Sequence, residues 1–203
     1  MQFMDKKNIE LELRAAVSRR FYNGILAKLK KKARLISHTK RLSVMYFGKI
    51  GGKSFDIRVR ITNGKPEVVI KKGKLHAHDR IEISSPITRQ QFIKMVELFE
   101  LFDFKTEVAK RETYNFNIKD NIVFSIVKAD NIFYIEAEKM TSKQDIIKDK
   151  KQLINIFKEY RLKPVTSERE FNKICDELSK YSDWPFNGSK SDYEKLKKLL
   201  GKY

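Results

Sequence analysis

The feature that most constrains the fold is a set of short segments in which apolar and charged residues alternate and the charges are sorted by sign. Residues 8–14, 56–61 and 133–139 all show this pattern. A period of two is typical of β-strands, because successive side chains of a strand point to opposite faces. The charged positions in chain order are Glu10, Glu12 and Arg14, then Arg58 and Arg60, then Glu136 and Glu138. Each segment is therefore predicted to be a strand with one apolar and one charged face.

Like charges that share a strand face repel each other, so these doublets need a neutralising partner. A sheet with one solvated face also alternates, and this interpretation suffices for any single strand. It does not explain sorted charge on several strands, because glutamate is disfavoured in strands and the pair Glu136 and Glu138 needs a cation or basic neighbours. Convergence of the strands on one lumen explains the whole set. We therefore expect a closed antiparallel β-barrel of about eight strands.

The remaining pattern predicts a single α+β domain over residues 1–203, because no linker or repeat divides the chain. Strands are expected at residues 8–14, 42–47, 54–61, 67–72, 79–84, 106–116, 121–127 and 132–139. Helices are expected at about 17–35, 88–102, 143–160, 168–181 and 191–200. Thr88 is a plausible N-cap, and Asn63-Gly64 is a hairpin signal. The barrel would span about residues 8–140 and be flanked by helices, with C-terminal helices over about 143–203.

Six charged motifs follow one another along these segments. They are Glu10-Leu11-Glu12-Leu13-Arg14, Arg58-Val59-Arg60, Lys71-Lys72-Gly73, Arg80-Ile81-Glu82, Lys110-Arg111 and Glu136-Ala137-Glu138. In order and spacing they resemble the strands of the CYTH superfamily, the triphosphate tunnel metalloenzymes. The first resembles the E-x-E-x-K signature of that family, with arginine in place of lysine, and the last resembles its closing E-x-E.

The resemblance implies a barrel interior that binds a triphosphate together with a divalent metal, Mg²⁺ or Mn²⁺. These metals prefer oxygen ligands, and guanidinium groups bind two phosphate oxygens at once. The implied metal ligands are Glu10, Glu12, Glu136 and Glu138, and the implied catalytic residues are Glu10, Glu12 and Glu82. The implied phosphate ligands are Arg14, Arg58, Arg60, Lys71, Lys72, Arg80, Lys110 and Arg111. The alternation leaves open which of Lys71 and Lys72, and which of Lys110 and Arg111, faces inward.

The activity that the resemblance implies is metal-dependent hydrolysis of the terminal phosphate of a triphosphate. Tripolyphosphate, thiamine triphosphate, a nucleotide and an RNA 5′ triphosphate all remain open as substrates. Two alternatives are an adenylyl cyclase of the class IV type and a non-catalytic protein that binds polyphosphate or RNA 5′ ends. The family pattern often has a further acidic residue at Ser84 and another near Ser125, so the number of metals stays open.

The formal net charge of +18 indicates an anionic substrate or partner. The lumen residues account for almost none of this excess, so RNA is a second candidate partner, and solvated lysines are the simpler explanation. No segment is apolar enough to cross a membrane, and the single cysteine, Cys175, fits a reducing cytoplasm. The pair His76 and His78 is expected in a solvated turn, because it lacks a third ligand. The sequence leaves the oligomeric state open.

Overall fold

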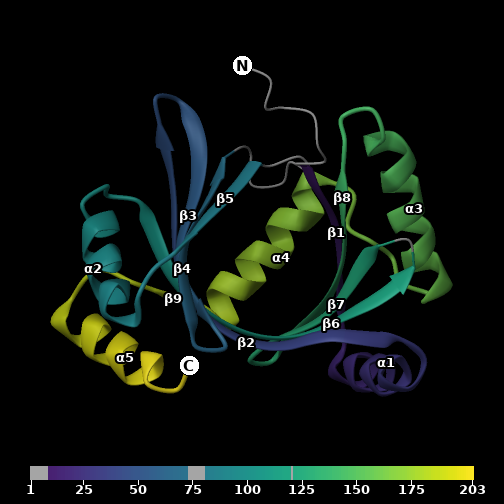
Figure 1. Ribbon diagram of the computed structural model, residues 1–203, viewed down its shortest axis with the longest axis horizontal. Coiled ribbons are helices and arrows are strands. Elements are labelled where there is room, and N and C mark those ends of the chain that lie inside the picture. Colours follow the sequence, from purple (N-terminus) through teal and green to yellow (C-terminus); the bar gives the residue numbers. More distant parts are fainter. Residues whose placement is uncertain (1–8, 73–80, 120) are drawn as a thin grey trace.

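The computed structural model describes residues 9–72, 81–119 and 121–203. In this part of the chain one antiparallel sheet holds nine strands, and five helices pack around it (Figure 1). The strands are β1 (Ile9–Val17), β2 (Arg34–Ile50), β3 (Lys53–Thr62), β4 (Lys65–Lys72), β5 (Ile81–Pro86), β6 (Lys105–Lys119), β7 (Ile122–Ala129), β8 (Ile132–Thr141) and β9 (Trp184–Pro185). The helices are α1 (Arg19–Lys32), α2 (Arg89–Glu100), α3 (Ile146–Glu159), α4 (Glu168–Tyr181) and α5 (Lys190–Leu200). The predicted α+β class is confirmed.

The sheet curls into an open half-barrel, so the prediction of a closed barrel is wrong. Its hydrogen-bonded order is β1-β8-β7-β6-β2-β3-β4-β5, with β9 beside β6, and no ladder between described residues joins β1 to β5. The helix α4 lies in the concavity, between the two ends of the curl (Figure 1). Its residues Ile174 and Leu178 pack against Val127, Ala129 and Tyr134 of β7 and β8. This helix occupies space that side chains fill in a closed eight-stranded barrel, and the edges stay apart.

The apolar strand faces point to the convex side, where helices cover them in two separate cores. One core lies beneath α1 and α3 and includes Leu11 and Phe124 of the sheet. The other lies beneath α2 and α5 and includes Tyr46 and Val59. Burial of these apolar side chains is the main stabilising contribution to such a fold. Because the helices cover the apolar faces, the charged faces predicted from the alternation are left to the concave side.

Two local sequence signals are confirmed. Thr88 caps α2: its hydroxyl accepts a hydrogen bond from the backbone N–H of Gln91, and the Gln91 side chain accepts one from the backbone N–H of Thr88. Asn63 and Gly64 connect β3 to β4 with φ angles of 47° and 81°. A two-residue hairpin turn of this kind needs both residues in the left-handed region, which asparagine and glycine tolerate best.

The boundary between α1 and β2 differs from the prediction. The helix ends at Lys32 rather than near residue 35, and β2 begins at Arg34 rather than at residue 42. A register irregularity between Leu35 and Ser37 interrupts the alternation at the start of β2. The strand therefore contributes more positions to the concave face than the sequence pattern indicated. Among the helices of the described residues, none combines the length and apolar character that a membrane span requires.

Candidate active site

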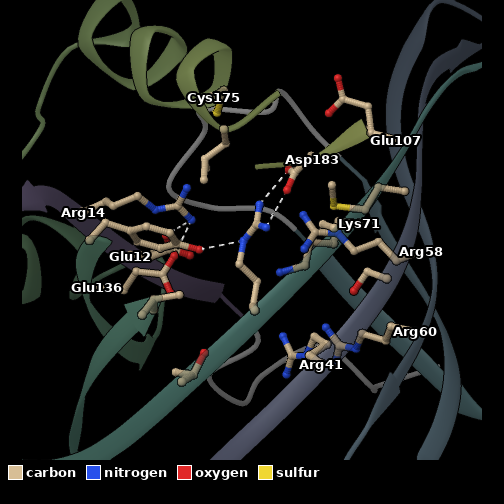
Figure 2. A pocket seen from close by; sticks show the side chains of 18 of the residues that line it. Glu12, Arg14, Arg41, Arg58, Arg60, Lys71, Glu107, Glu136, Cys175 and Asp183 are labelled. Atoms are coloured by element: carbon tan, nitrogen blue, oxygen red, sulfur yellow. Dashed lines mark hydrogen bonds and ion pairs between the residues drawn. The ribbon is translucent and has the colours of Figure 1, made fainter. Parts of the chain in front are cut away.

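A cavity of about 550 Å³ lies on the concave side of the half-barrel, and strands β1 to β8 and helix α4 all contribute to its lining. Figure 2 shows its two charged flanks, with Glu12, Arg14 and Glu136 on one and Arg41, Arg58 and Arg60 on the other. The basic side chains of the lining are Arg14, Arg41, Arg58, Arg60, Lys71, Lys105 and Arg111. The acidic ones are Glu10, Glu12, Glu82, Glu107, Glu136, Glu138, Asp176 and Asp183.

Most of the residues predicted from the sequence meet in this cavity. They are Glu10, Glu12, Arg14, Arg58, Arg60, Lys71, Glu82, Arg111, Glu136 and Glu138. Lys72 is exposed and Lys110 pairs with Asp130, and neither lines the cavity. These two lysines are therefore withdrawn as phosphate ligands, because the alternation of β4 and β6 sends adjacent side chains to opposite faces. Arg80, like His76 and His78, lies outside the described residues.

On the flank formed by β3 and β4, the cations have carboxylate partners from the same or the next strand. Arg58 donates two hydrogen bonds to Asp56, of 2.8 and 2.6 Å, and Asp56 is buried. Arg60 donates to Glu67 at 2.8 Å. Bidentate and charge-assisted contacts of this kind hold guanidinium groups in fixed positions. This flank is therefore largely neutralised from within the protein.

Lys71 and Glu82 pair across β4 and β5 at the edge of the same flank. Their Nζ and Oε2 atoms are 2.5 Å apart, and Arg60 lies 3.5 Å from the other oxygen of Glu82. Burial opposes ionisation of Glu82, but Lys71 and then Arg60 outweigh it and lower the pKa of this carboxyl. Glu82 is therefore ionised, and it orients a lysine that the sequence predicted as a phosphate ligand.

Arg41 of β2 is a cation of the cavity lining that the sequence analysis missed, as is Lys105 of β6, which pairs with Glu107 at 2.8 Å. The Nε of Arg41 donates to the hydroxyl of Thr62 at 3.0 Å, and Arg41 forms no ion pair with a described residue. Burial, followed by repulsion from Arg60 and Arg58, lowers its pKa to about 10. The signal that could have found it is the alternation of Thr39, Arg41 and Ser43, which continues the concave face of β2.

On the opposite flank, β1 and β8 bring four carboxylates together around a single arginine. In the antiparallel register Glu12 lies opposite Glu138, and Arg14 lies opposite Glu136. Arg14 forms ion pairs with both Glu136 and Glu12, the latter at 2.8 Å. Arg14, predicted as a phosphate ligand, lines the cavity and offsets the charge of these carboxylates.

The carboxylates of this flank are short of positive charge. Burial raises the pKa of Glu136 to about 7, and Glu12 adds to the shift while Arg14 opposes it. Burial raises the pKa of Glu138 to about 8, and Glu10, Glu136 and Glu12 all add to this shift. Glu138 forms no ion pair with any residue that the structure describes. A cation placed here would therefore be strongly favoured.

The two flanks touch across the open side of the half-barrel through one ion pair. Lys71 of β4 lies 3.3 Å from Glu10 of β1, measured from Nζ to Oε2. These strands are at or next to the two ends of the sheet order. A side-chain contact thus stands where backbone hydrogen bonds would close a barrel.

The floor of the cavity, formed by β6 and capped by α4, is also internally paired. Arg111 donates to both oxygens of Asp183, at 2.6 and 2.7 Å, and to the hydroxyl of Tyr134 at 3.2 Å (Figure 2). Ser179 of α4 donates to Glu107 at 3.0 Å. Asp183 and Glu107 were not predicted, because no strand motif marks them. Arg111 is therefore saturated by the protein in a way that Arg41 is not.

Two further positions were singled out in the sequence. Ser125 lines the cavity and donates to Asn115 at 2.7 Å, whereas Ser84 is exposed on β5. Cys175 faces the cavity from α4, and burial raises the pKa of its thiol. A cysteine in that state is a poor nucleophile.

The carboxylates of β1 and β8 fit a hard divalent cation in kind, since they offer only oxygen donors. Among the described residues, no three side chains of the ligand types His, Cys, Asp and Glu converge closely enough to hold a metal by themselves. Magnesium ions usually take one or two carboxylates and complete their shell with water and substrate phosphates. Glu138 and its neighbours match this kind of site better than a closed cage of protein ligands.

The chain was compared with known proteins at the levels of sequence and structure. No protein-family model matches it, and no curated protein matches it by sequence. Among solved structures, the PH1012 protein from Pyrococcus horikoshii OT3 matches with a TM-score of 0.60 and 21% identity, covering 76% of this chain and 92% of that chain. A proposed adenylate cyclase from Vibrio parahaemolyticus matches with a TM-score of 0.59 and 14% identity, covering 83% and 99%.

A third solved structure is HpAC1 from Hippeastrum, a proposed adenylyl cyclase. It matches with a TM-score of 0.51 and 17% identity, covering 79% of this chain and 90% of that chain. Likeness at these identities concerns the fold. The chain has the same curled antiparallel fold as these structures, which agrees with the resemblance of its strand motifs to the CYTH superfamily.

Proposed function

We propose that the chain is a divalent-metal-dependent triphosphatase that hydrolyses the terminal phosphate of an inorganic or organic triphosphate. The observation that carries the proposal is the opposite imbalance of the two flanks of one cavity. Arg41 is a half-buried cation with no ionic partner among the described residues, and Glu138 belongs to a carboxylate cluster with too few cations. A polyphosphate bound together with its metal ion would supply an anion to Arg41 and a cation to the carboxylate cluster.

The triphosphate would lie along the flank formed by β2, β3 and β4. Arg41 supplies a guanidinium that needs an anion, and Arg58 and Arg60 are held in place by their own carboxylates. Positioning the phosphate chain and stabilising charge as the leaving group departs are the main tasks in phosphoryl transfer. Lys71, held by Glu82, adds an ammonium at the end of the same flank.

The opposite flank would hold the metal through Glu138 and its neighbours Glu10, Glu12 and Glu136. Mg²⁺ or Mn²⁺ bound there would polarise the phosphoryl oxygens and lower the pKa of coordinated water. Glu10 and Glu12 accept hydrogen bonds from the attacking water and orient it. The water oxygen forms the new bond to the terminal phosphorus, and the bridging P–O bond breaks with its electron pair on the departing diphosphate. The proton of the water passes to solvent, and orthophosphate is the second product.

Names of the structural neighbours support a choice between two reactions on this site. The Vibrio protein is named only as a proposed adenylate cyclase, whereas the Hippeastrum protein shows a dominant triphosphatase activity. A cyclase needs the ribose hydroxyl of ATP to attack its own α-phosphorus, which requires a nucleoside pocket. Hydrolysis needs only the phosphates and water, which the charged lining serves, so we place it first.

The test is a phosphate-release screen with tripolyphosphate, thiamine triphosphate, ATP and triphosphorylated RNA, each with Mg²⁺, with Mn²⁺ and with a chelator. Release of one orthophosphate per triphosphate, dependent on metal, is the expected result. ATP reactions are also examined for cyclic AMP, which would support the cyclase instead. Lys72→Ala and Lys110→Ala serve as controls outside the cavity and should retain full activity. Binding of triphosphates with no turnover of any of them would overturn the proposal in favour of a binding protein.

A further inference from the structure

The helix α1 on the convex side carries six basic residues and no acidic residue. The six are Arg19, Arg20, Lys28, Lys30, Lys31 and Lys32, all of them exposed. None forms an ion pair with a residue that the structure describes, and Arg19 is instead hydrogen-bonded to the neutral side chain of Asn131. The helix therefore presents an unneutralised positive surface outside the catalytic cavity.

The other helices show that this surface is not a uniform effect of composition. The helix α4 has four acidic and three basic residues, and α2 has two of each. A chain whose lysines were scattered by composition alone would give all five helices a similar balance. The positive excess is instead concentrated on α1, with a smaller excess on α3 and on α5.

Helix stability does not account for the charges at the start of α1. The last-turn residues Lys30, Lys31 and Lys32 lie at the negative end of the helix dipole, where cations are favourable. Arg19 and Arg20 lie in the first turn, at the positive end, where acidic residues are favoured. This placement is unfavourable with respect to the helix dipole, so the dipole does not explain these two charges.

The surface continues onto α3, which packs beside α1 on the same core (Figure 1). The Nζ of Lys28 in α1 lies 5.5 Å from the ring centroid of Tyr160, the C-cap residue of α3. Lys148, Lys151 and Lys158 of α3 are exposed. We name these three lysines and the six basic residues of α1 the convex basic surface.

The chemistry of this surface favours a phosphate backbone over a membrane or an acidic protein. The large apolar residues Tyr22, Ile25 and Leu29 of α1 are buried in the core, so the helix has no apolar face left to insert into lipid. A stable protein interface needs aromatic or aliphatic anchors at its centre, which the exposed positions of α1 lack. Attraction of nucleic acid needs only basic groups spaced along phosphates.

We propose that the convex basic surface binds the phosphate backbone of RNA. The choice of RNA over DNA rests on the proposed function, because an RNA 5′ end carries a triphosphate. The basic surface itself does not distinguish the two nucleic acids. The bound RNA and the triphosphate in the cavity occupy opposite sides of the sheet, so each site can be tested without the other.

The experiment measures binding of a 5′-hydroxyl RNA, which carries no triphosphate for the cavity, as a function of salt. A triple variant, Arg20→Glu with Lys28→Glu and Lys31→Glu, is compared with a matched one on α5, Lys190→Glu with Lys197→Glu and Lys198→Glu. Both change the net charge equally. We expect the α1 variant to lose about tenfold or more in affinity and about two units of the slope of log K against log salt, with the α5 variant nearly unchanged.

Thermal unfolding checks that both variants fold. Tripolyphosphate hydrolysis should be unchanged in both variants, so that a loss of RNA binding is distinguished from a failure of the proposed function. Equal losses of RNA affinity in the two variants would show that the affinity depends only on net charge. This result would contradict the assignment of RNA binding to the convex basic surface. A single-stranded DNA of the same sequence should bind comparably, because the surface contacts backbone phosphates, and failure to bind it would overturn recognition through the phosphate backbone. Leu35 and Ile36 are exposed just beyond α1, so vesicles rich in phosphatidylserine form a further arm. Binding to these vesicles but not to RNA would replace the proposal with a membrane contact.

Discussion

On the flank formed by β3 and β4, each cation of the cavity has a carboxylate from a strand of its own hairpin or the next one. On the flank formed by β1 and β8, four carboxylates share two cations, Arg14 of β1 and Lys71 of β4. The first arrangement keeps its groups ionised and fixed, whereas the second raises the pKa of Glu136 to about 7 and of Glu138 to about 8. The same strand alternation thus builds one flank in which Arg41 alone lacks an ionic partner among the described residues, and one in which four carboxylates share too few cations.

The difference teaches that the ordered charge has two separate purposes. Paired residues such as Arg58 and Asp56 hold geometry and need no ligand. Groups without an ionic partner among the described residues, Arg41 and Glu138, are where we propose that ligands of opposite charge bind, and such binding would also stabilise the folded chain. Substitutions at such groups, rather than at the most conspicuous motifs, therefore test the site most directly.

The largest effect is expected from Glu138→Gln. The change removes a proposed metal ligand while keeping the shape of the side chain, and metal-assisted transfer is expected to slow by more than about 100-fold. Without metal, thermal stability should be unchanged or slightly higher, because a half-buried carboxylate next to others is removed. Turnover at limiting metal and thermal unfolding measure the two effects. Glu112→Gln on the convex face is the control, and undiminished turnover in Glu138→Gln would contradict the assignment.

The next effect separates an uncompensated arginine from a compensated one. Arg41→Ala and Arg58→Ala should both weaken substrate binding and slow turnover, by about 10- to 100-fold, with lysine replacements milder because they keep charge and lose the planar fork. Stability should differ in direction. Arg41→Ala leaves it unchanged or raised, since a half-buried cation without an ion pair to a described residue is removed, whereas Arg58→Ala lowers it by about 2 kcal/mol, because the buried carboxylate of Asp56 loses a bidentate donor.

Chemical denaturation of both alanine variants without metal or phosphate makes that comparison directly. Equal destabilisation of the two proteins would show that Arg41 is compensated in solution. The distinction between paired and unpaired groups would then fail on this flank.

A moderate effect is expected from the metal itself. Mg²⁺ or Mn²⁺ at about 100 times its dissociation constant should add roughly 2.7 kcal/mol to the folded state, a rise of several degrees in the unfolding temperature. A chelator should reverse it. The rise should nearly vanish in Glu138→Gln and persist in Arg41→Ala, because only the first lies on the carboxylate flank. An equal rise in both variants would place the cation elsewhere.

The smallest effect on activity is expected from Asp183→Asn. This change weakens the ion pair of Arg111 and leaves that arginine, like Arg41, without a strong ionic partner. With the ion pair weakened, Arg111 becomes available to phosphate, and KM for tripolyphosphate should fall by about two- to threefold. Stability should fall by about 1 kcal/mol, because a bidentate pair becomes a weaker neutral contact. Steady-state kinetics and thermal unfolding check this, with Ser179→Ala as a matched loss of another contact of α4. A higher KM would show that Asp183 orients Arg111 for substrate.

The sequence predicted nearly every strand and helix, because the periods of two and 3.6 residues survive along most of the chain. It missed the first part of β2, where the irregularity between Leu35 and Ser37 breaks the period, and with it Arg41. Closure of the barrel was predicted wrongly, since alternation reports which face a residue occupies and not whether two edges meet. The amphipathic pattern of α4 likewise shows one apolar face without indicating on which side of the sheet it packs.

Within the candidate site, sequence reasoning gathered the right strand faces but could not assign partners. It grouped Arg14 with the phosphate ligands because the motif placed a basic residue there, and only the pairing of β1 with β8 brings that arginine onto Glu136. The choice between Lys71 and Lys72 depended on the register with β5, which two adjacent lysines do not encode. Asp183 lies in no regular motif, and its contact with Arg111 spans 72 residues of sequence.

The position of α4 inside the curl also bears on how the molecule opens. Its buried apolar side chains rest on β7 and β8, so it moves with the carboxylate flank. Toward β6 it is joined by a hydroxyl contact to Glu107, and β5 ends the sheet on the far side. We therefore expect the amide hydrogens of β5, the end strand of the sheet, to exchange before those of the strands that α4 covers. Movement of β4 and β5 away from β1 would break the ion pair between Lys71 and Glu10, which joins the two flanks across the open side of the half-barrel.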